Sequence, residues 1–501
     1  MNFIVFVLGT FRLDNLNLYS PRKAIPITPN LNRLLEESAS FENYYISSYP
    51  SIPLLHDLFT GTFGFLSRGW VPLGSEEQTV IGSLEKMGYV TKGIFDNPAL
   101  EGDGFNYMRD FSGWDWIRGQ HRDRWRTHSE KVPHHFAPLK NKDTDTLKPY
   151  FRNVAMRTTM ENDWTGVRTA KTAVAWLEQR PRNQPFFLLI NLWDPHEPFE
   201  APANDFNHFV DSKREKELVL FPKNGRSTYL SGDELDILRN RYMAKVHYCD
   251  RLVGSVLSAS QNLGLYGDTT IIVTSDHGYL FGEHDLIGKP FGPLGKLWDP
   301  LAKVPLIIRH PLGLGQGRRL DALVQPPDLS GTIMELATGT PAIGHSLIPL
   351  ITGERASHRS LAVSGRFDSP ITGISASLSG VVTEPITLTS DDWTLMLSPW
   401  DSPSLFRRAI DLGQMNNVAE DHPDIIDKFS QGFEKFLSGH HTDRHRSCEY
   451  GNMFEGEGLV HLSESCGNIS FYTFATHGVC FAFLELDVAR RHVTVVKRTT
   501  P

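Results

Sequence analysis

The sequence predicts an α/β fold in which a mostly parallel sheet is covered by helices on both faces, with a smaller antiparallel sheet subdomain toward the C-terminus. Three observations support this prediction. Residues 3–8 form a continuous apolar run, which is typical of a strand buried on both faces. Helical and strand patterns then alternate along the chain, as in a parallel sheet. After about residue 364 the pattern becomes a Ser/Thr-rich alternation, which favours antiparallel strands.

The predicted elements follow one another in the order of such a sheet. The apolar run is the first strand, and an open α/β sheet provides a functional loop after its C-terminal end. Thr28 and Pro29 predict the cap and the first turn of a helix that continues through Leu35. The remaining predictions, in chain order, are a helix at 81–87, a strand at 90–95, an irregular insertion at 109–162, a helix at 169–177, a strand at 186–192, a long helix at about 233–263, strands at 270–274 and 304–308, and antiparallel strands within 371–389 and at 393–397.

Composition limits the class of protein. The 501 residues are 40% hydrophobic, which is enough for one large core or for a large and a small domain. The net charge of -8, with both signs interspersed, predicts no nucleic-acid partner and no polybasic membrane patch. No apolar run is long enough to span a bilayer, and the opening run lacks a basic leader and breaks at Gly9. The four cysteines form no Cys-x-x-Cys pair, so we expect no thiolate metal site. So few cysteines in so long a chain also favour a cytoplasmic protein. The sequence does not decide whether the protein forms a homo-oligomer.

The strongest candidate site follows the strand at 270–274, where the sequence reads Ser-Asp276-His277-Gly278 and then Gly-Glu-His. A strand that ends this way brings a carboxylate and an imidazole to the C-terminal edge of the sheet, and the glycine lets the backbone turn sharply. That arrangement suits a divalent cation. The alternative is an ordinary turn with a surface histidine, and the motif alone does not decide between the two.

Ser-Asp-His-Gly followed by Gly-Glu-His resembles the segment that closes the metal site in the sulfatase family, including its phosphonate and phosphodiester hydrolase relatives of the alkaline phosphatase superfamily. The Thr-Pro-Asn-Leu-Asn-Arg-Leu run at 28–34 is similar to a helix of the same family, and the resemblance extends to about residue 435. It implies an alkaline phosphatase-like fold in which Asp276 and His277 bind one divalent metal ion. Ca²⁺ is the first choice for that ion, with Mn²⁺ or Mg²⁺ as alternatives.

On this resemblance the chain divides into three parts. Residues 1–363 correspond to a sulfatase-like catalytic domain, and residues 364–435 to a small C-terminal α+β subdomain. Residues 436–501 form a tail to which the sequence assigns no role.

The segment 47–61 is similar to the family signature Cys/Ser-x-Pro-x-Arg, a short helix, and then Leu-x-Thr-Gly. The family nucleophile lies ten residues before that glycine, which selects Ser51 as nucleophile and as a further metal ligand. A nucleophile at a helix N-terminus is physically reasonable, because free backbone amides and the helix dipole stabilise an alkoxide and a bound anion. A competing alignment uses Ser48 but has the wrong distance to Gly61. A Pro-rich loop that simply enters a helix is the non-catalytic alternative.

Two further positions match the family's anion-binding groups. His196, in Asp-Pro-His-Glu-Pro after the strand at 186–192, matches a histidine that hydrogen-bonds the sulfuryl or phosphoryl oxygens; as general chemistry it could protonate a leaving oxygen. Without the other motifs, a simple turn residue between prolines would be the better interpretation. Relatives also place a lysine on the anion, where its ammonium neutralises developing charge. Lys289 and Lys296 both fit, with Lys289 slightly favoured.

Two positions depart from the family pattern. Relatives end the first strand in Asp-Asp or Asp-Thr, and the first carboxylate binds metal. Here the sequence is Gly9-Thr10, so only the Thr10 hydroxyl is expected there, as a weak ligand, and Asp14 is unlikely to reach the same point. Leu55 replaces the arginine that accompanies oxidation of the nucleophile to formylglycine, which makes this conversion doubtful. An unmodified serine beside a metal suits phosphoryl transfer better than sulfuryl transfer.

The leading hypothesis is therefore a sulfatase-like hydrolase that acts on a small-molecule sulfate ester, phosphodiester or phosphonate monoester. The alternative is a catalytically degenerate member that acts as a binding or scaffold protein, motivated by Gly9 and Leu55. Restoring Gly9→Asp and Leu55→Arg is expected to separate the two. An enzyme similar to phosphopentomutase or phosphoglycerate mutase would need two metals and more ligands than these motifs supply.

Overall fold

The computed structural model describes residues 1–16, 27–66, 70–100, 104–127, 144–155, 157, 160–211, 220–341, 343–366, 385–398 and 400–440, together with the backbone of four strands between 463 and 497. Among these residues, no helix has both the length and the apolar character needed to cross a membrane.

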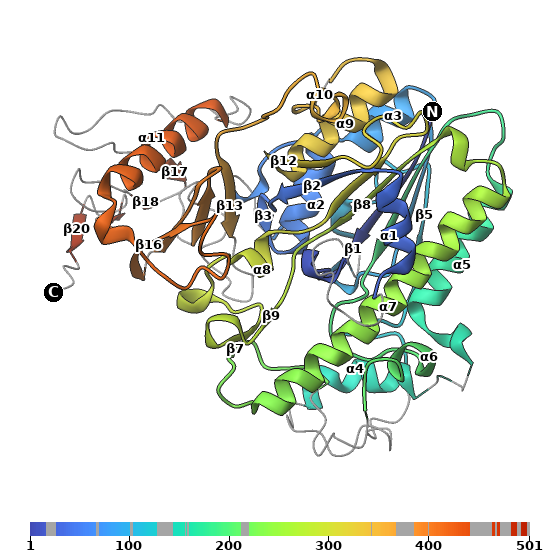
Figure 1. Cartoon of the computed structure of the whole chain (residues 1–501), viewed down its shortest axis with the longest axis horizontal. Coiled ribbons are helices and arrows are strands. Elements are labelled where there is room, and N and C mark those ends of the chain that lie inside the picture. Colours follow the sequence, from blue (N-terminus) through green and yellow to red (C-terminus); the bar gives the residue numbers. More distant parts are fainter. Residues whose placement is uncertain are drawn as a thin grey trace.

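The main sheet has eight strands, and it is mostly parallel (Figure 1). Every pairing recorded in it is parallel except those of β11, which runs antiparallel to both of its neighbours. In spatial order the strands are β12 (Arg319–Val324), β2 (Ala39–Tyr44), β11 (Leu306–Arg309), β8 (Thr269–Ser275), β1 (Asn2–Leu8), β6 (Phe186–Leu192), β4 (Val90–Phe95) and β5 (Gly113–Trp116).

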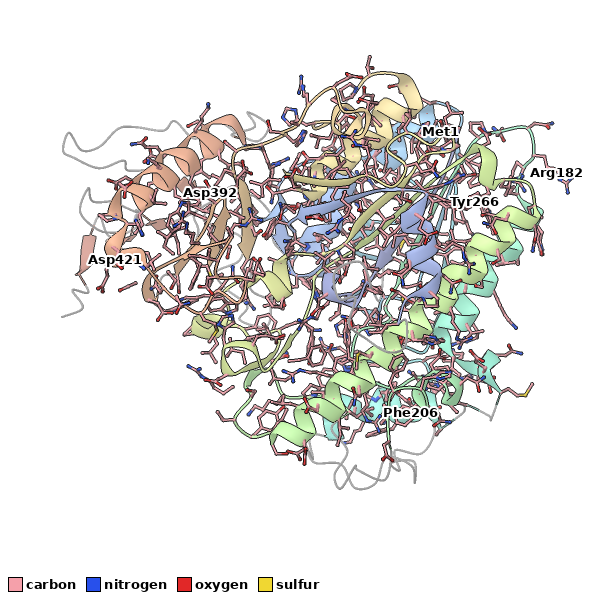
Figure 2. The ribbon with its side chains drawn as sticks, viewed as in Figure 1. Met1, Arg182, Phe206, Tyr266, Asp392 and Asp421 are labelled. Atoms are coloured by element: carbon pink, nitrogen blue, oxygen red, sulfur yellow. The ribbon has the colours of Figure 1, made fainter. Side chains whose placement is uncertain are left out.

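The first strand shows why both faces of this sheet are covered. Successive side chains of a strand point to opposite faces. Phe3 and Val5 of β1 therefore pack in one hydrophobic cluster, whereas Ile4 and Phe6 pack in another. The first cluster includes residues of α2 (Ser51–Thr60), α3 (Val80–Lys86) and α9 (Pro326–Thr338), and the second includes residues of α1 (Pro29–Glu36), α5 (Thr165–Gln179) and α7 (Gly232–Asn262). Side chains fill the space between sheet and helices (Figure 2).

The predicted helix after Thr28 is present as α1, but its cap differs from the prediction. The Thr28 side chain caps no backbone amide. Instead the Asp250 carboxylate of α7 accepts hydrogen bonds from the amides of Asn30 (3.0 Å) and Leu31 (2.7 Å). A carboxylate at a helix N-terminus satisfies free N–H groups and opposes the helix dipole. A partner about 220 positions away thus replaces the local cap.

A second sheet of five strands lies beside the main one, as predicted for the C-terminal part (Figure 1). Its order is β16 (Asp401–Arg407), β15 (Trp393–Ser398), β14 (Ile386–Thr389), β13 (Ala362–Arg366) and β3 (Ser48–Tyr49), and α11 (Pro423–His440) packs against it. The pairings are antiparallel except that of β13 with β3. Because β3 comes from the N-terminal part and directly precedes α2, the small sheet supports the segment that carries Ser51.

The remaining elements are small. A short sheet consists of β7 (Gly225–Arg226), which precedes β8 in the chain, and of β10 (Leu286–Gly288) and β9 (Leu280–Phe281), which follow it. The tail contains an antiparallel sheet of β17 (Ser463–Ser465), β18 (Asn468–Ser470), β19 (Ala482–Asp487) and β20 (His492–Lys497). The other helices are α4 (Thr144–Val154), α6 (Ala203–Phe206), α8 (Asp299–Ala302) and α10 (Ile348–Thr352). The predicted insertion contributes β5 and α4, whereas 128–143 and 367–384 lie outside the described residues. Cys249 is a buried free thiol, and the other three cysteines lie outside the described residues. The division into three parts stays a prediction.

The register of the central strands positions the candidate site. Leu8 of β1 pairs with Ser275 of β8 on one side and with Leu192 of β6 on the other. The residues that follow these three strand ends therefore emerge side by side at the C-terminal edge of the sheet. This edge is where open α/β sheets place ligands.

Candidate active site

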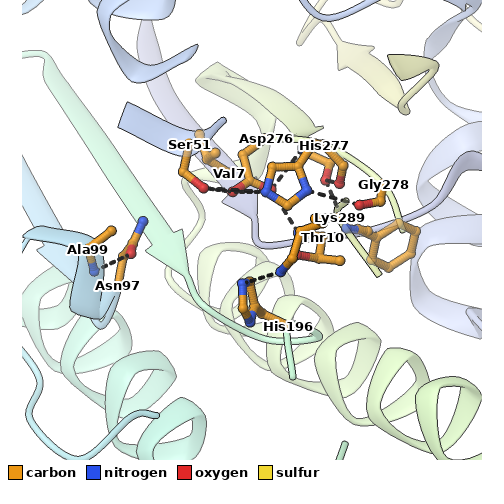
Figure 3. A network of polar contacts seen from close by, with 12 residues as sticks. Val7, Thr10, Ser51, Asn97, Ala99, His196, Asp276, His277, Gly278 and Lys289 are labelled. Carbon is orange, nitrogen blue, oxygen red and sulfur yellow. Dashed lines mark hydrogen bonds and ion pairs between the residues drawn. The ribbon is translucent and has the colours of Figure 1, made fainter. Parts of the chain in front are cut away.

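Ser51 lies at the first position of α2, and its side chain faces the end of β8 (Figure 3). The Ser51 hydroxyl donates a hydrogen bond to Asp276 Oδ2 at 2.5 Å, and it lies 3.5 Å from His277 Nε2. Ser51 is buried, with 4% of its surface exposed. The competing residue Ser48 accepts a hydrogen bond from the Phe65 amide at 2.9 Å. Of the two candidate serines, the structure brings Ser51 to the Asp-His pair.

The Asp276 carboxylate is held in place by backbone amides. Its Oδ1 accepts hydrogen bonds from the amides of Thr10 (2.7 Å) and His277 (2.8 Å), which leaves Oδ2 for Ser51. The His277 ring is oriented through Nδ1, which donates to the Gly278 carbonyl at 2.9 Å, so the lone pair of Nε2 faces Ser51. Burial lowers the pKa of His277 despite the neighbouring Asp276, which favours the neutral ring.

A second polar group lies beside the first one. Lys289 donates a hydrogen bond to His196 Nε2 at 2.6 Å, and its ammonium lies 2.8 Å and 2.9 Å from the two carboxylate oxygens of Glu197. His196 Nδ1 in turn donates to the Glu197 carbonyl at 2.8 Å. Burial, and next the Lys289 charge, hold the pKa of His196 well below its usual range, consistent with a neutral ring that accepts from Lys289. The rings of His196 and His277 are 6.4 Å apart, so the two groups form one site.

The structure does not bring Lys296 to this site. Its ammonium donates to Ser404 Oγ at 3.1 Å and lies 3.2 Å from the Asp401 carboxylate. Both partners belong to β16 of the small sheet. Lys296 therefore connects the loop before α8 to the small sheet, and Lys289 is the lysine that accompanies His196.

Gly9 occupies the position where the sequence resemblance predicts a metal-binding carboxylate, and the structure shows no room for a side chain there. A Cβ at this position would lie 2.4 Å from the Trp193 carbonyl oxygen, which is a backbone atom. That carbonyl accepts a hydrogen bond from the His196 amide at 2.9 Å, so it cannot move without disturbing the His196 loop. A Gly9→Asp substitution therefore requires this backbone to shift before a carboxylate can occupy the position.

The residues that follow Gly9 at the end of β1 make different contacts. Thr10 adopts a positive φ of 65°, and its buried hydroxyl has no hydrogen-bond partner among the described residues. Asp14 is half exposed and pairs with Arg12 at 2.8 Å, and Arg12 also pairs with Glu283 at 2.8 Å. Arg12 thus connects the first loop to the Gly-Glu-His segment. Leu55 is 1% exposed and packs in a hydrophobic cluster, so an arginine there would be buried among apolar side chains.

The donor atoms at this edge fit one divalent cation. Asp276 Oδ2, His277 Nε2 and Ser51 Oγ are mutually 2.5–3.5 Å apart, as donor atoms around a single ion are. The unpartnered Thr10 hydroxyl is a candidate for a fourth donor. Within the described ranges no group of three or more His, Cys, Asp or Glu residues could hold a metal. This set has two such residues, Asp276 and His277, and hydroxyl oxygens supply its other donors. One carboxylate implies a weaker site than one with several.

Sequence reasoning missed two residues near this site. Glu197 directly follows the predicted anion-binding histidine in Asp-Pro-His-Glu-Pro, and this neighbouring position could have identified it. His121 lies in the insertion, where no periodic pattern marks it. It is 1% exposed, stacks on Phe221 with ring centroids 4.6 Å apart, and lies 6.4 Å from the His196 ring. Both of its ring nitrogens are without a hydrogen-bond partner among the described residues.

Two buried carboxylates, those of Asp96 and Asp194, hold the residues next to His196 in place. Asp96, directly after β4, accepts a hydrogen bond from the Trp193 amide at 2.6 Å, and Asp194 lies 3.0 Å from the Lys245 ammonium. The Gln120 amide lies between the carboxylates, 3.4 Å from Asp96 and 3.1 Å from Asp194. Burial, and next the Asp194 charge, raise the pKa of Asp96 to about 7. This network fixes the strand ends rather than touching Ser51.

Comparison with known proteins places this geometry in a family. The family model described as Sulfatase matches residues 1–340. Arylsulfatase K of Xenopus laevis is 24% identical over 449 residues, covering 82% of this chain and 78% of the relative. The uncharacterized sulfatase YidJ of Escherichia coli (strain K12) is 26% identical over 446 residues, covering 84% of this chain and 83% of the relative.

Solved structures show the same fold. The phosphonate monoester hydrolase of Agrobacterium radiobacter aligns with a TM-score of 0.69 at 18% identity, over 88% of this chain and 96% of that one. The phosphonate monoester hydrolase SpPMH of Silicibacter pomeroyi aligns with a TM-score of 0.65 at 22% identity, over 88% and 96%. Family homologues are sulfuric ester hydrolases, and sulfatases generally bind a divalent metal. With an alkaline phosphatase-like sheet and a family match over most of its length, this chain belongs to the sulfatase family.

Proposed function

We propose that this protein hydrolyses sulfate esters, or phosphodiesters or phosphonate monoesters, of small molecules, with Ser51 as the nucleophile. The observation that supports this most strongly is the convergence of Ser51 with Asp276 and His277, with the Lys289–His196 pair alongside. A hydroxyl, a proton acceptor and a cation are the groups that such a reaction requires.

The proposed reaction begins at the Ser51 hydroxyl. Its proton is directed at Asp276 Oδ2, which therefore serves as the base. The Ser51 oxygen forms a bond to the sulfur or phosphorus while the bond to the leaving oxygen breaks, and the leaving group departs as an alkoxide that takes a proton from solvent. The Lys289 ammonium stabilises the negative charge on the transferred group. Water then cleaves the covalent intermediate and regenerates the serine. His196 accepts from Lys289 in this state, so its role is to orient that ammonium.

A divalent cation fits beside these groups. Asp276, His277, Ser51 and Thr10 would hold it, with Ca²⁺ as the first choice. When bound it would supply Lewis-acid stabilisation of charge on the anion. Thermal unfolding measured with Ca²⁺, Mn²⁺ or Mg²⁺ tests this part, because an ion that binds only the folded state raises the melting temperature. The shift should disappear in His277→Ala.

Turnover is the decisive test. The purified protein, incubated with each cation, is assayed with 4-nitrophenyl sulfate, bis(4-nitrophenyl) phosphate and a 4-nitrophenyl phosphonate monoester. Release of 4-nitrophenol from at least one substrate is expected. A folded, cation-loaded sample that releases none from any of them contradicts the proposal. Mass spectrometry of the peptide that contains Ser51 shows in parallel whether the residue is serine or formylglycine.

A degenerate binding protein is the second candidate, and two observations favour it. The Trp193 carbonyl closes the position of the family carboxylate at Gly9, and Leu55 is part of the hydrophobic core. Such a protein would bind a sulfate ester equally well before and after Ser51→Ala and would turn over the ester in neither form. Calorimetric affinities of both forms for 4-nitrophenyl sulfate, measured beside the turnover assay, therefore separate the two candidates.

A further inference from the structure

Glu197 is the carboxylate that contacts Lys289, the cationic side chain of the candidate site. Its side chain is 1% exposed, and its two oxygens lie 2.8 Å and 2.9 Å from the Lys289 ammonium. The same carboxylate lies 3.1 Å from His196 Nδ1. A buried ion pair of this kind is strongly coupled, because little water screens it. Any anion that approaches Lys289 therefore also meets the field of Glu197.

The charged groups around the site favour a substrate that carries a single negative charge. Asp276 and Glu197 are the two carboxylates, and Lys289 is the cationic side chain. Lys245 and Asp194 pair with each other, and Arg122 is solvent-exposed and therefore screened. With a divalent cation added, these groups carry a net charge of about +1. A monoanionic ester neutralises this charge, whereas a dianion leaves an excess negative charge in a buried place.

We propose that Glu197 is a specificity-determining residue that selects esters with one negative charge over dianionic phosphate monoesters. This inference rests on the proposed function, because it assumes that the substrate anion binds at Lys289. Sulfate monoesters, phosphodiesters and phosphonate monoesters each carry one negative charge, so they form a single class by this criterion. Phosphate monoesters, which carry two near pH 8, are the excluded class.

The test compares two substrates with the same leaving group. 4-Nitrophenyl sulfate is a monoanion, and 4-nitrophenyl phosphate is a dianion at pH 8. In Glu197→Gln, the ratio of kcat/KM for phosphate to kcat/KM for sulfate should rise about tenfold or more, since one buried negative charge no longer opposes the second charge of the phosphate. Glu197→Asp keeps the charge and should keep the wild-type ratio. An unchanged ratio in Glu197→Gln overturns the proposal, even if both activities fall.

Glu200→Gln provides a matched control. Glu200 lies three residues further along the same loop and pairs with Arg157 at 2.9 Å, so the change also removes one partner of a largely buried ion pair. Its ion-pair partner is Arg157 rather than Lys289. Its substrate ratio should equal that of the wild type. A rise as large as in Glu197→Gln would show that loosening the loop is sufficient, and it would overturn the assignment.

A binding measurement makes the inference independent of turnover. Calorimetric titration with inorganic phosphate at pH 8 should give an affinity about tenfold or more higher for Glu197→Gln than for the wild type. If the wild type is inert toward every ester, the proposed function fails, but this comparison still decides the role of Glu197. Equal affinities overturn it. Glu197→Ala removes the same charge and replaces the glutamine variant in both measurements if that variant does not fold.

Discussion

The Ser51 hydroxyl lies 2.5 Å from the Asp276 carboxylate, although 225 positions separate the two residues in the chain. Ser51 is the first residue of α2, and Asp276 directly follows β8. The small sheet supports β3 in front of Ser51, while the parallel register of β1 and β8 places Asp276 beside Thr10. Two layers of the fold thus meet at one hydrogen bond, and the expected chemistry depends on it.

Two serine variants distinguish the candidate nucleophiles. Ser51→Ala should reduce kcat by about 10³-fold or more with little change in stability, because it removes the attacking oxygen. Ser48→Ala should retain activity within a few-fold but lower the melting temperature, since the Ser48 hydroxyl accepts the buried Phe65 amide. Steady-state kinetics and thermal unfolding of both variants provide the measurement. Loss of turnover in Ser48→Ala alone would favour the competing alignment.

Substitution of Gly9 should destabilise the protein rather than repair it. Gly9→Ala places a Cβ against the Trp193 carbonyl and should cost about 1–3 kcal/mol in the free energy of unfolding, and Gly9→Asp should cost at least as much. Gly232→Ala, in open space at the start of α7, is the control and should be neutral or slightly stabilising. Denaturant unfolding measures all three. A Gly9→Asp protein as stable as the wild type would refute this close approach.

Replacement of His121 should increase stability. Its two ring nitrogens have no hydrogen-bond partner among the described residues, and an unpaired buried polar group costs about 1–3 kcal/mol. His121→Phe keeps an aromatic ring against Phe221 and should raise the free energy of unfolding by about 1 kcal/mol. His247→Phe is the contrast, because it removes a 2.7 Å contact with Asp205 and should destabilise. A lower melting temperature for His121→Phe would contradict the prediction.

Stability should fall as the pH rises through the range set by Asp96. Burial raises the pKa of Asp96 to about 7 in the folded protein, whereas an unfolded aspartate titrates near 4. Between these values the folded state binds the additional proton, so this residue stabilises folding at low pH and loses that contribution as pH approaches 7. The slope is at most about 1.4 kcal/mol per pH unit.

Asp96→Asn isolates this contribution. The amide is neutral at every pH, so the difference in unfolding free energy between variant and wild type should grow from pH 5 to pH 8 in favour of the variant. Urea unfolding at several pH values measures it, and the comparison at pH 5 serves as the internal reference. A difference that stays constant across this range would show that Asp96 titrates normally.

Much of the fold was predictable because its signals are local. The strands at 90–95 and 186–192 coincide with β4 and β6, and the long helix predicted at about 233–263 is α7. Apolar periodicity produces such elements without reference to the rest of the chain. The cap of α1 was not predictable in this way, since Asp250 reaches it from another helix. The capping role that propensity predicts for Thr28 is taken by a tertiary contact with Asp250.

The sequence by itself determined the kind of fold, the order of its elements and the chemical groups at the strand ends, because these follow from short-range patterns and motif spacing. Only the tertiary structure decided that Ser51 rather than Ser48 meets Asp276, that Lys289 rather than Lys296 meets His196, and that the Trp193 carbonyl closes the space at Gly9. Each of these depends on the distance between atoms that are remote in the chain. Packing of the two sheets sets that distance, and no local pattern encodes it.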